Sequence, residues 1–151
     1  NNQAAKTGIY KYADYCPSGL KAGWLGQSES NELQWRDVYS HKGGKYELTI
    51  ACISGENRTM AVDVNGQRVQ TISVSSGSWN TVAKKTVSIQ LKKGRNTIRL
   101  SNATGWMPDI DYIDVRPVFQ EPASMTARIP PLRAKVMGSV VVLSTFWMRR
   151  M

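Results

Sequence analysis

The chain has 151 residues, of which 41% are hydrophobic and 21% charged, and its formal net charge is +9. This length is common for one domain with its own core, and the composition is that of a globular protein rather than a disordered or membrane-embedded one. Residues 1–119 carry 15 basic and 10 acidic side chains, and residues 120–151 carry five and one. The excess of basic side chains before residue 120 is spread along the chain, which favours a solvated surface over a nucleic-acid-binding stripe. We expect no nucleic-acid partner.

The sequence shows neither a membrane segment nor a secretory signal. The most apolar stretch, Val136 to Met148, is interrupted by small and polar residues and is well short of the roughly 20 residues that span a bilayer. We therefore expect no membrane anchor. The chain opens with Asn-Asn-Gln, and we interpret it as an excised domain whose targeting segment was not included.

The strand pattern begins weakly and then becomes regular. Residues 1–34 mix aromatic side chains with glycines, and we expect loops and one or two short strands there. From Lys45 to Val115, short β-branched runs alternate with period two and are cut by Gly and Asn at intervals of about ten residues. No segment shows the 3.6-residue apolar stripe of a helix. The pattern predicts an all-β fold, an antiparallel β-sandwich. In its first regular strand the inner face is formed by Tyr46, Leu48, Ile50 and Cys52.

Two hairpins are predicted within this region. The dipeptide Asn65-Gly66 separates two alternating runs and tolerates the positive φ angles of a type I′ turn. The runs at residues 87–91 and 98–100 flank a polar turn at residues 93–96, which predicts a second hairpin. A last strand, with Asp111, Ile113 and Val115 on one face, ends at Pro117 because proline cannot donate to a central ladder.

The two cysteines, Cys16 and Cys52, lack the close spacing of a zinc or redox site and allow at most one disulfide. Cys52 follows the alternation of a strand, which favours a buried thiol. A disulfide to Cys16 requires that the two Cα atoms lie within about 7 Å of each other. The sequence does not decide between these alternatives.

The composition changes after Phe119. Prolines break the chain, acidic residues end at Glu121, and Met and Arg become frequent. We therefore divide the chain into a β-sandwich module at residues 1–119 and an unassigned basic tail at residues 120–151. The sequence leaves several alternatives open for this tail: an extra strand at Lys135–Trp147, a linker, a cloning remnant or a poorly ordered arm.

Two stretches carry a family likeness. Residues 92–100 (Lys-Lys-Gly-Arg-Asn-Thr-Ile-Arg-Leu) and residues 105–114 (Gly-Trp-Met-Pro-Asp-Ile-Asp-Tyr-Ile-Asp) resemble the last two strands of carbohydrate-binding modules of families 6 and 35. The likeness extends back to Gly23-Trp24-Leu25-Gly26 and covers about residues 20–116. The chain looks most similar to the family 35 modules that are appended to bacterial α-galactosidase-like glycoside hydrolases.

The resemblance implies a jelly-roll sandwich without catalysis, which binds a poly- or oligosaccharide through loops at one end. In the family, an aromatic residue and an amide or acid before the last strand contact the sugar, and these positions fall on Trp106 and Asp109. Arg58 occupies the position of a polar contact residue. Trp24 and Tyr15 are candidates to complete the aromatic surface.

The family usually carries a structural calcium ion, held between a Glu-x-Glu pair on the first strand and an aspartate of the last. The last-strand ligand here is Asp111, and the opening Asn-Asn-Gln-Ala-Ala contains no such acidic pair. A lone carboxylate does not supply the 6–8 oxygen ligands that calcium takes. Either the first strand was cut off with its ligands, or this chain lacks the ion.

Apart from the resemblance, the residues indicate only that the loop before the predicted last strand displays a tryptophan. Trp106 lies between Gly105 and Pro108 in a polar loop outside any alternation, which favours an exposed ring on which a pyranose face stacks. The alternative is a tryptophan that packs its own loop onto the sandwich. Trp35 and Trp79 fall near predicted strand starts, and we interpret them as core or sandwich-edge residues.

Arg58 and the pair formed by Asp109 and Asp111 each have an alternative interpretation. The guanidinium of Arg58 offers donors for sugar hydroxyls or a uronate carboxylate, and the alternative is an ordinary loop arginine. Asp109 and Asp111 lie roughly 7 Å apart on an extended strand, within the spacing of about 6.5–9.5 Å of an inverting glycosidase. No other catalytic motif accompanies them, so a hydroxyl acceptor and a structural carboxylate are the simpler assignment.

We therefore predict a non-catalytic module that directs an attached glycoside hydrolase to a glycan, with a galactose-containing glycan as the first candidate. The parent protein is expected to be bacterial and secreted, periplasmic or on the cell surface. A second class is a protein-interaction or adhesion β-sandwich, in which Trp106 is buried in its own loop. A third is a small glycan hydrolase that uses Asp109 and Asp111.

Overall fold

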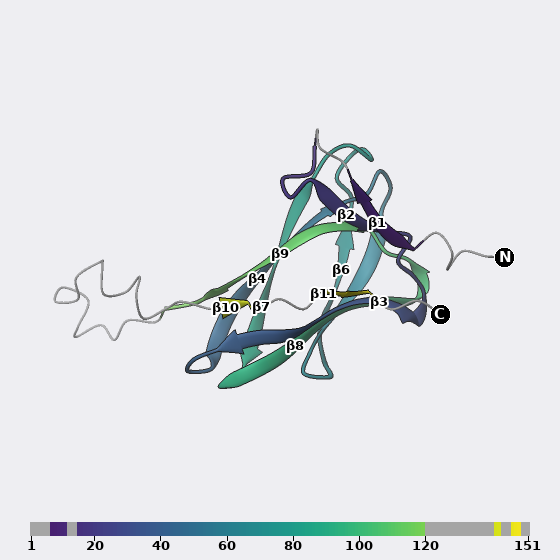
Figure 1. Cartoon of the computed structure of the whole chain (residues 1–151). Helices are drawn as coiled ribbons and strands as arrows, with labels where there is room; N and C mark the ends of the chain where they lie inside the picture. The colour runs from purple at the N-terminus through teal and green to yellow at the C-terminus, as the bar shows by residue number, and fades with distance from the viewer. Residues whose placement is uncertain (1–6, 12–14, 120–140, 143–145, 149–151) are drawn as a thin grey trace.

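The strands of the chain form two antiparallel sheets that pack face to face (Figure 1). The computed structural model describes residues 7–11, 15–119, 141–142 and 146–148. Every regular element in these ranges is a strand, and none of the described segments is a helix long and apolar enough to cross a membrane. The all-β sandwich predicted from the period-two alternation is confirmed.

In the described part of the chain, sheet A has the strand order β1-β2-β9-β4-β7 and sheet B the order β10-β3-β8-β5-β6, with β11 also paired to β3. The strands of sheet A are β1 (Gly8–Lys11), β2 (Leu20–Gly23), β4 (Gly44–Ile53), β7 (Ala83–Leu91) and β9 (Asp109–Pro117). The strands of sheet B are β3 (Gly26–Ser40), β5 (Arg58–Val64), β6 (Gln67–Val74), β8 (Gly94–Trp106), β10 (Val141–Val142) and β11 (Phe146–Met148).

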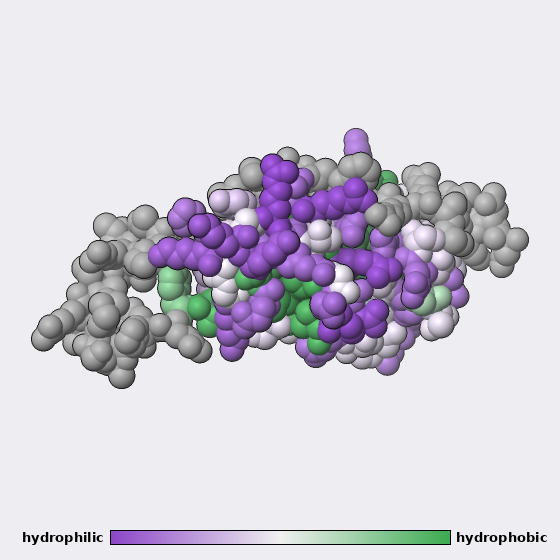
Figure 2. All heavy atoms as spheres, turned by 90° about the horizontal axis from the view of Figure 1, so that it is seen from below, coloured by the Kyte–Doolittle hydropathy of each residue, from purple (hydrophilic) through white to green (hydrophobic). Residues whose placement is uncertain are grey.

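The core lies between the inner faces of the two sheets. In β4, Leu48 and Ile50 are fully buried, as the alternation predicts, and β8 contributes Ile98 and Leu100 from the opposite sheet. Burying a side chain of this size contributes about 1.5–3 kcal/mol. Trp35 is also buried in this core, as predicted. Seen from below, the surface is mainly hydrophilic, and hydrophobic side chains gather in its central part (Figure 2).

The hairpin predicted at residues 65–66 is confirmed. Asn65 has a φ of 50° and Gly66 a φ of 81°, and the turn joins β5 to β6 in adjacent positions of sheet B. Positive φ at both central positions is the geometry that matches the twist of the two strands.

The second predicted hairpin is wrong, because β7 pairs with β4 in sheet A whereas β8 pairs with β3 and β5 in sheet B. The chain therefore crosses from one sheet to the other between Leu91 and Gly94. The buried side chain of Asn96 holds this crossing in place. Its Oδ1 accepts from the backbone N–H of Lys92 at 2.9 Å, and its Nδ2 donates to the carbonyl of Val38 at 3.2 Å.

Strand β9 ends at Pro117 as predicted, but its alternation is interrupted. The two neighbours of Asp111 pair with adjacent residues of β4, Ala51 and Cys52, so Asp111 is the extra residue of a β-bulge. The common face predicted for Asp111, Ile113 and Val115 is therefore not continuous across the bulge.

Both cysteines are buried and unpaired, so the buried-thiol alternative is the one that the structure contains. Burial raises the pKa of the Cys52 thiol to about 11. Burial also raises the pKa of the Cys16 thiol, and the nearby charge of Asp111 adds to the effect. Neither thiol is ionised at neutral pH.

Two short strands, β10 and β11, fall within the region predicted as a basic tail, and both pair with β3 at the edge of sheet B. The other residues of the tail, and most of the strand predicted at Lys135–Trp147, lie outside the described residues. A module boundary at residue 119 stays a prediction.

Candidate functional site

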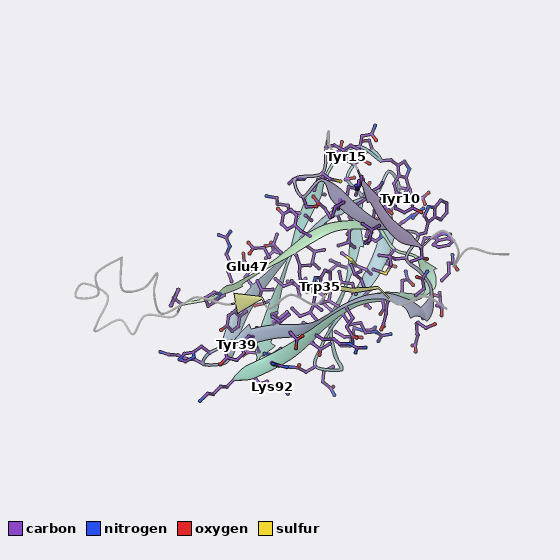
Figure 3. All side chains as sticks on the ribbon, in the orientation of Figure 1. Tyr10, Tyr15, Trp35, Tyr39, Glu47 and Lys92 are labelled. Carbon is purple, nitrogen blue, oxygen red and sulfur yellow. The ribbon has the colours of Figure 1, made fainter. Side chains whose placement is uncertain are left out.

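Four loops meet at one end of the sandwich, here called the loop end. They are residues 24–25, 54–57, 75–82 and 107–108, which connect β2 to β3, β4 to β5, β6 to β7 and β8 to β9. The pairings Ile53 with Asp109 and Arg58 with Val74 bring these loops together. The opposite end of the sandwich lies near Tyr39 and Lys92 (Figure 3).

Two tryptophans form an aromatic pair at the loop end. The rings of Trp24 and Trp106 meet edge to face, with centroids 5.6 Å apart and an interplanar angle of 85°. Trp24 is 40% exposed, and Trp106 is half-buried. An edge-to-face pair of this kind adds about 0.5–1.5 kcal/mol beyond the area that it buries. The geometry keeps indole surface accessible to solvent while it fixes the ring orientations.

The backbone around this pair is held in an uncommon conformation. Trp24 has a φ of 59°, which L-residues adopt rarely, and its carbonyl accepts from the side chains of Thr7 at 2.8 Å and Asn31 at 2.9 Å. Gly26 has a φ of 101° and lies so close to the backbone of Gly105 that a Cβ atom would overlap with it. The close approach of β3 to β8, together with the two hydrogen bonds to its carbonyl, therefore fixes the position of Trp24.

Arg58 connects three of the loops. Its Nη1 donates to the carbonyl of Met107 at 3.1 Å, and its Nε donates to Oε1 of Glu56 at 2.7 Å. Its guanidinium carbon lies 4.6 Å from the centroid of the Trp79 ring, a cation–π distance. Arg58 is thus a structural link at the loop end as well as a candidate contact.

Trp79 is a loop-end residue that the sequence interpretation missed. It lies in the β6–β7 loop and is 41% exposed, rather than in the core or at a sandwich edge. Its indole packs against Gly55, where any Cβ atom would overlap with the ring. The polar Gly77-Ser78-Trp79-Asn80 context is typical of a loop and is the signal that could have identified it.

Asp109 is largely buried, and its charge is paired within the protein. Its Oδ2 lies 2.6 Å from Nζ of Lys21, and the two side chains are 12% and 9% exposed. Burial alone would lower the pKa of Lys21, but the hydrogen bond and charge of Asp109, together with Tyr15, outweigh burial and raise it. Oδ1 of Asp109 lies beside Gly23, which has no side chain to cover it.

Tyr15 and Asp111 lie near this ion pair rather than beside the tryptophans. The Tyr15 ring centroid is 5.7 Å from Nζ of Lys21. Oδ1 of Asp111 accepts from the hydroxyl of Ser18 and, at 3.4 Å, from its backbone N–H, whereas Oδ2 is buried and has no hydrogen-bond partner. The structure thus gathers Trp24, Trp106 and Arg58 at the loop end, with Asp109 at the boundary between the two groups.

A model of the family described as carbohydrate binding module (family 35) matches residues 19–118. The chain belongs to carbohydrate-binding module family 35. The resemblance inferred from residues 92–114 is confirmed, and so are the jelly-roll sandwich and the absence of catalysis, since this is a family of non-catalytic carbohydrate-binding modules. The prediction of a sugar-binding module is therefore correct, and neither the hydrolase nor the adhesion alternative is supported.

Solved structures resemble this family 35 module. A family 35 module from Clostridium thermocellum shares 26% identity at a TM-score of 0.68, over 73% of this chain and 87% of that one. A family 35 module of Abf62 from Cellvibrio japonicus has 24% identity and a TM-score of 0.66, over 75% and 84%. An exo-β-1,3-galactanase from Phanerochaete chrysosporium has 25% identity and a TM-score of 0.63, over 73% of this chain and 26% of that one. No curated protein sequence matches the chain.

A metal site at Asp111 finds little support among its described neighbours. The described residues contain no group of three or more His, Cys, Asp or Glu side chains that could hold an ion. One oxygen of Asp109 is paired with the Lys21 ammonium, which repels a divalent cation, and calcium requires 6–8 oxygen ligands. The residues near Asp111 therefore do not fit a calcium ion, although the Oδ2 atom of Asp111 has no partner.

Proposed function

We propose that the loop end binds a segment of a glycan and that a sugar ring stacks on the surface formed by Trp106 and Trp24. The observation that carries this proposal is the edge-to-face pair of indoles at the loop end, in which Trp24 is 40% exposed and Trp106 is half-buried. The C–H face of a pyranose is apolar, whereas its rim is polar. A site of this kind therefore combines a ring surface with a few fixed polar groups.

Trp79 and Arg58 provide the second side of the proposed site. Trp79 presents an exposed indole, and the guanidinium of Arg58 lies over it. Donors that Arg58 does not use for Glu56 and Met107 would bind hydroxyls. Oδ1 of Asp109, beside Gly23, is the proposed hydroxyl acceptor. Tyr15 contacts Lys21 and would act through the Lys21–Asp109 pair.

A galactose-containing glycan is the first candidate ligand, and an attached glycoside hydrolase is the proposed partner in the parent protein. The similarity to an exo-β-1,3-galactanase, whose structure contains β-1,3-galactotriose, supports both ideas. We further propose that the parent is a secreted or surface-bound bacterial protein, because polymeric glycans lie outside the cell. Calcium, the one cofactor suggested by the family, is not needed for any of these contacts.

A glycan array followed by calorimetric titration tests the proposal. The parent chain is expected to bind at least one glycan, and Trp106→Ala is expected to lose most of that affinity. Phe119→Ala is the matched control, because this aromatic residue is 50% exposed and follows Pro117, which pairs with Tyr46 at the opposite end of β4. Unchanged affinity in Trp106→Ala would show that the stacking surface lies elsewhere.

A further inference from the structure

Three charged side chains lie together where β2 meets β9. They are Lys21, Asp109 and Asp111, here called the β2–β9 charge cluster. The backbone ladder between these strands is short, because one residue pair, Ala22 with Ile110, joins them in register. The Lys21–Asp109 ion pair spans the same junction at 2.6 Å, with both side chains about nine-tenths buried. A side-chain contact therefore reinforces a junction that has few backbone hydrogen bonds.

The ammonium of Lys21 supplies the positive charge of this cluster. Asp109 and Asp111 both lie at the start of the last strand, and a charged carboxylate that is removed from water needs a cation or several donors. Lys21 provides the cation for Asp109, and Ser18 provides two donors for Oδ1 of Asp111, whose Oδ2 has no hydrogen-bond partner. Asp109 therefore does not require a metal ion for charge balance.

The surroundings of Asp111 are also unlike those of a calcium ion. A hollow of about 360 Å³ lies beside its carboxylate, and the walls are mainly apolar, with Ile9, Leu20 and Ala22 among the lining residues. Calcium binds hard oxygen ligands. A divalent ion at this position would lie among aliphatic side chains and near the ammonium of Lys21.

We propose that the ion pair between Lys21 and Asp109, and not a calcium ion at Asp111, holds the junction between β2 and β9 together. The Lys21 ammonium neutralises the Asp109 carboxylate of β9 and ties β2, with the attached β2–β3 loop, to β9. The loop end of this chain is then independent of divalent metal ions. The proposal concerns folding and holds whether or not the assignment of the glycan contacts is correct.

Thermal unfolding of the whole chain tests the proposal. The midpoint is expected to be the same in a calcium-containing buffer and in excess EDTA. Lys21→Met keeps the aliphatic stem but removes the charge, and it is expected to lower the midpoint by roughly 5 °C or more in both buffers, because it leaves Asp109 unpaired. Lys45→Met, at an exposed position of β4, is the control and should leave the midpoint unchanged.

A double variant separates the charge from the packing. In Lys21→Met/Asp109→Asn no unpaired charge remains, so the midpoint should recover part of the loss. If EDTA lowers the midpoint of the parent chain, or calcium raises it, the proposal is overturned. Strictly additive losses in the double variant would overturn it as well, because the ion pair would then contribute nothing.

Discussion

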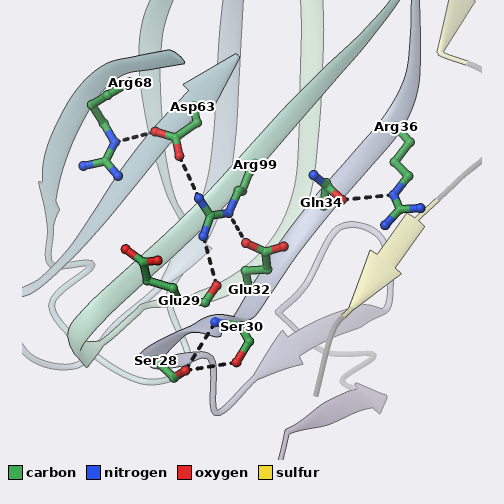
Figure 4. Close-up of polar contacts among 9 residues, drawn as sticks. All are labelled: Ser28, Glu29, Ser30, Glu32, Gln34, Arg36, Asp63, Arg68 and Arg99. Carbon is green, nitrogen blue, oxygen red and sulfur yellow. Dashed lines mark hydrogen bonds and ion pairs between the residues drawn. The ribbon is translucent and has the colours of Figure 1, made fainter. Parts of the chain in front are cut away.

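Two regions of the molecule use charged and aromatic side chains in opposite ways. On the outer face of sheet B, Arg99 donates to Glu32, to Asp63 at 3.0 Å and to the carbonyl of Glu29 at 2.9 Å, and Arg68 donates to Asp63 (Figure 4). Glu32 and Asp63 are almost fully buried. At the loop end, by contrast, Trp24 and Trp79 each keep about two-fifths of their surface exposed.

The difference shows which region has surface left for a ligand. On the sheet face, the charged groups satisfy one another, so this network contributes to folding without needing another molecule. At the loop end, the polar contacts of Thr7, Asn31 and Arg58 hold the loops in place, and the indoles stay partly exposed. Variants of the sheet face should therefore lose mainly stability, whereas variants of the loop end should lose mainly glycan affinity.

The largest effect is expected for Arg99→Met on the sheet face. The substitution leaves two buried carboxylates, Glu32 and Asp63, without their shared cation, and breaking such a network costs about 3–5 kcal/mol. The free energy of unfolding in urea should fall by this amount. Calorimetric titration of the remaining folded protein should give the glycan affinity of the parent. If Arg99→Met instead lost much of its glycan affinity at unchanged stability, the sheet face rather than the loop end would contain the binding site.

Trp106→Ala should give the opposite result. Removing a central aromatic contact typically costs about 2 kcal/mol or more of binding free energy, which is a fall in affinity of about 30-fold. Because the ring is half-buried and pairs with Trp24, the free energy of unfolding should also fall, by about 0.5–1.5 kcal/mol for the lost pair, which is less than for Arg99→Met. Titration and urea unfolding of the same preparation check both parts, and a fall in stability without a fall in affinity would identify Trp106 as a packing residue.

High pH should remove the contribution of the Lys21–Asp109 pair. Burial lowers the pKa of Lys21, but Asp109 and Tyr15 raise it more, so the folded pKa exceeds the ordinary value of 10.5. The stability that the ammonium contributes is therefore complete below pH 10.5 and is lost as pH rises through the raised pKa. The difference in unfolding free energy between the parent and Lys21→Met should therefore shrink as pH rises above 10.5. A difference that grows with pH would contradict this assignment.

The smallest effect is expected for Arg116→Met. Arg116 pairs with Asp114 at 2.7 Å, but the two side chains are 78% and 39% exposed, and exposed pairs contribute about 0–1 kcal/mol. The urea midpoint should therefore stay close to that of the parent. Comparing the loss of unfolding free energy in this variant with that in Arg99→Met tests whether burial, rather than ion pairing alone, gives the sheet-face network its contribution to stability. If Arg116→Met lost as much stability as Arg99→Met, burial would not be the reason for the difference.

The sequence predicts local structure well and the assignment of strands to sheets less well. Alternation identifies the inner face of β4, and Asn65-Gly66 identifies the turn between β5 and β6, because each signal lies in a few consecutive residues. The wrong hairpin at residues 93–96 has a physical cause. Leu91 and Ile98 face the same core from different sheets, and alternation is the same in either case. The bonds of Asn96 that mark the crossing become visible only in the fold.

In the candidate site, too, local features could be predicted from the sequence and long-range contacts could not. Trp106 is predicted from its polar loop and from the family motif, and the structure locates it at the loop end. The pairing of Asp109 with Lys21 joins residues 88 positions apart in the chain, so no local pattern indicates it. The prediction for Trp79 is wrong because an aromatic residue shortly before a β-branched run is also typical of a strand start.

Each of the four connections at the loop end leads from one sheet to the other. A ligand that touches two of them is therefore bound to both halves of the sandwich, and the halves cannot separate until it leaves. By mass action, a ligand that binds only the folded state raises the free energy of unfolding. On a dense polysaccharide, where released sites are refilled at once, the module would resist unfolding by heat or shear more than it does free in solution.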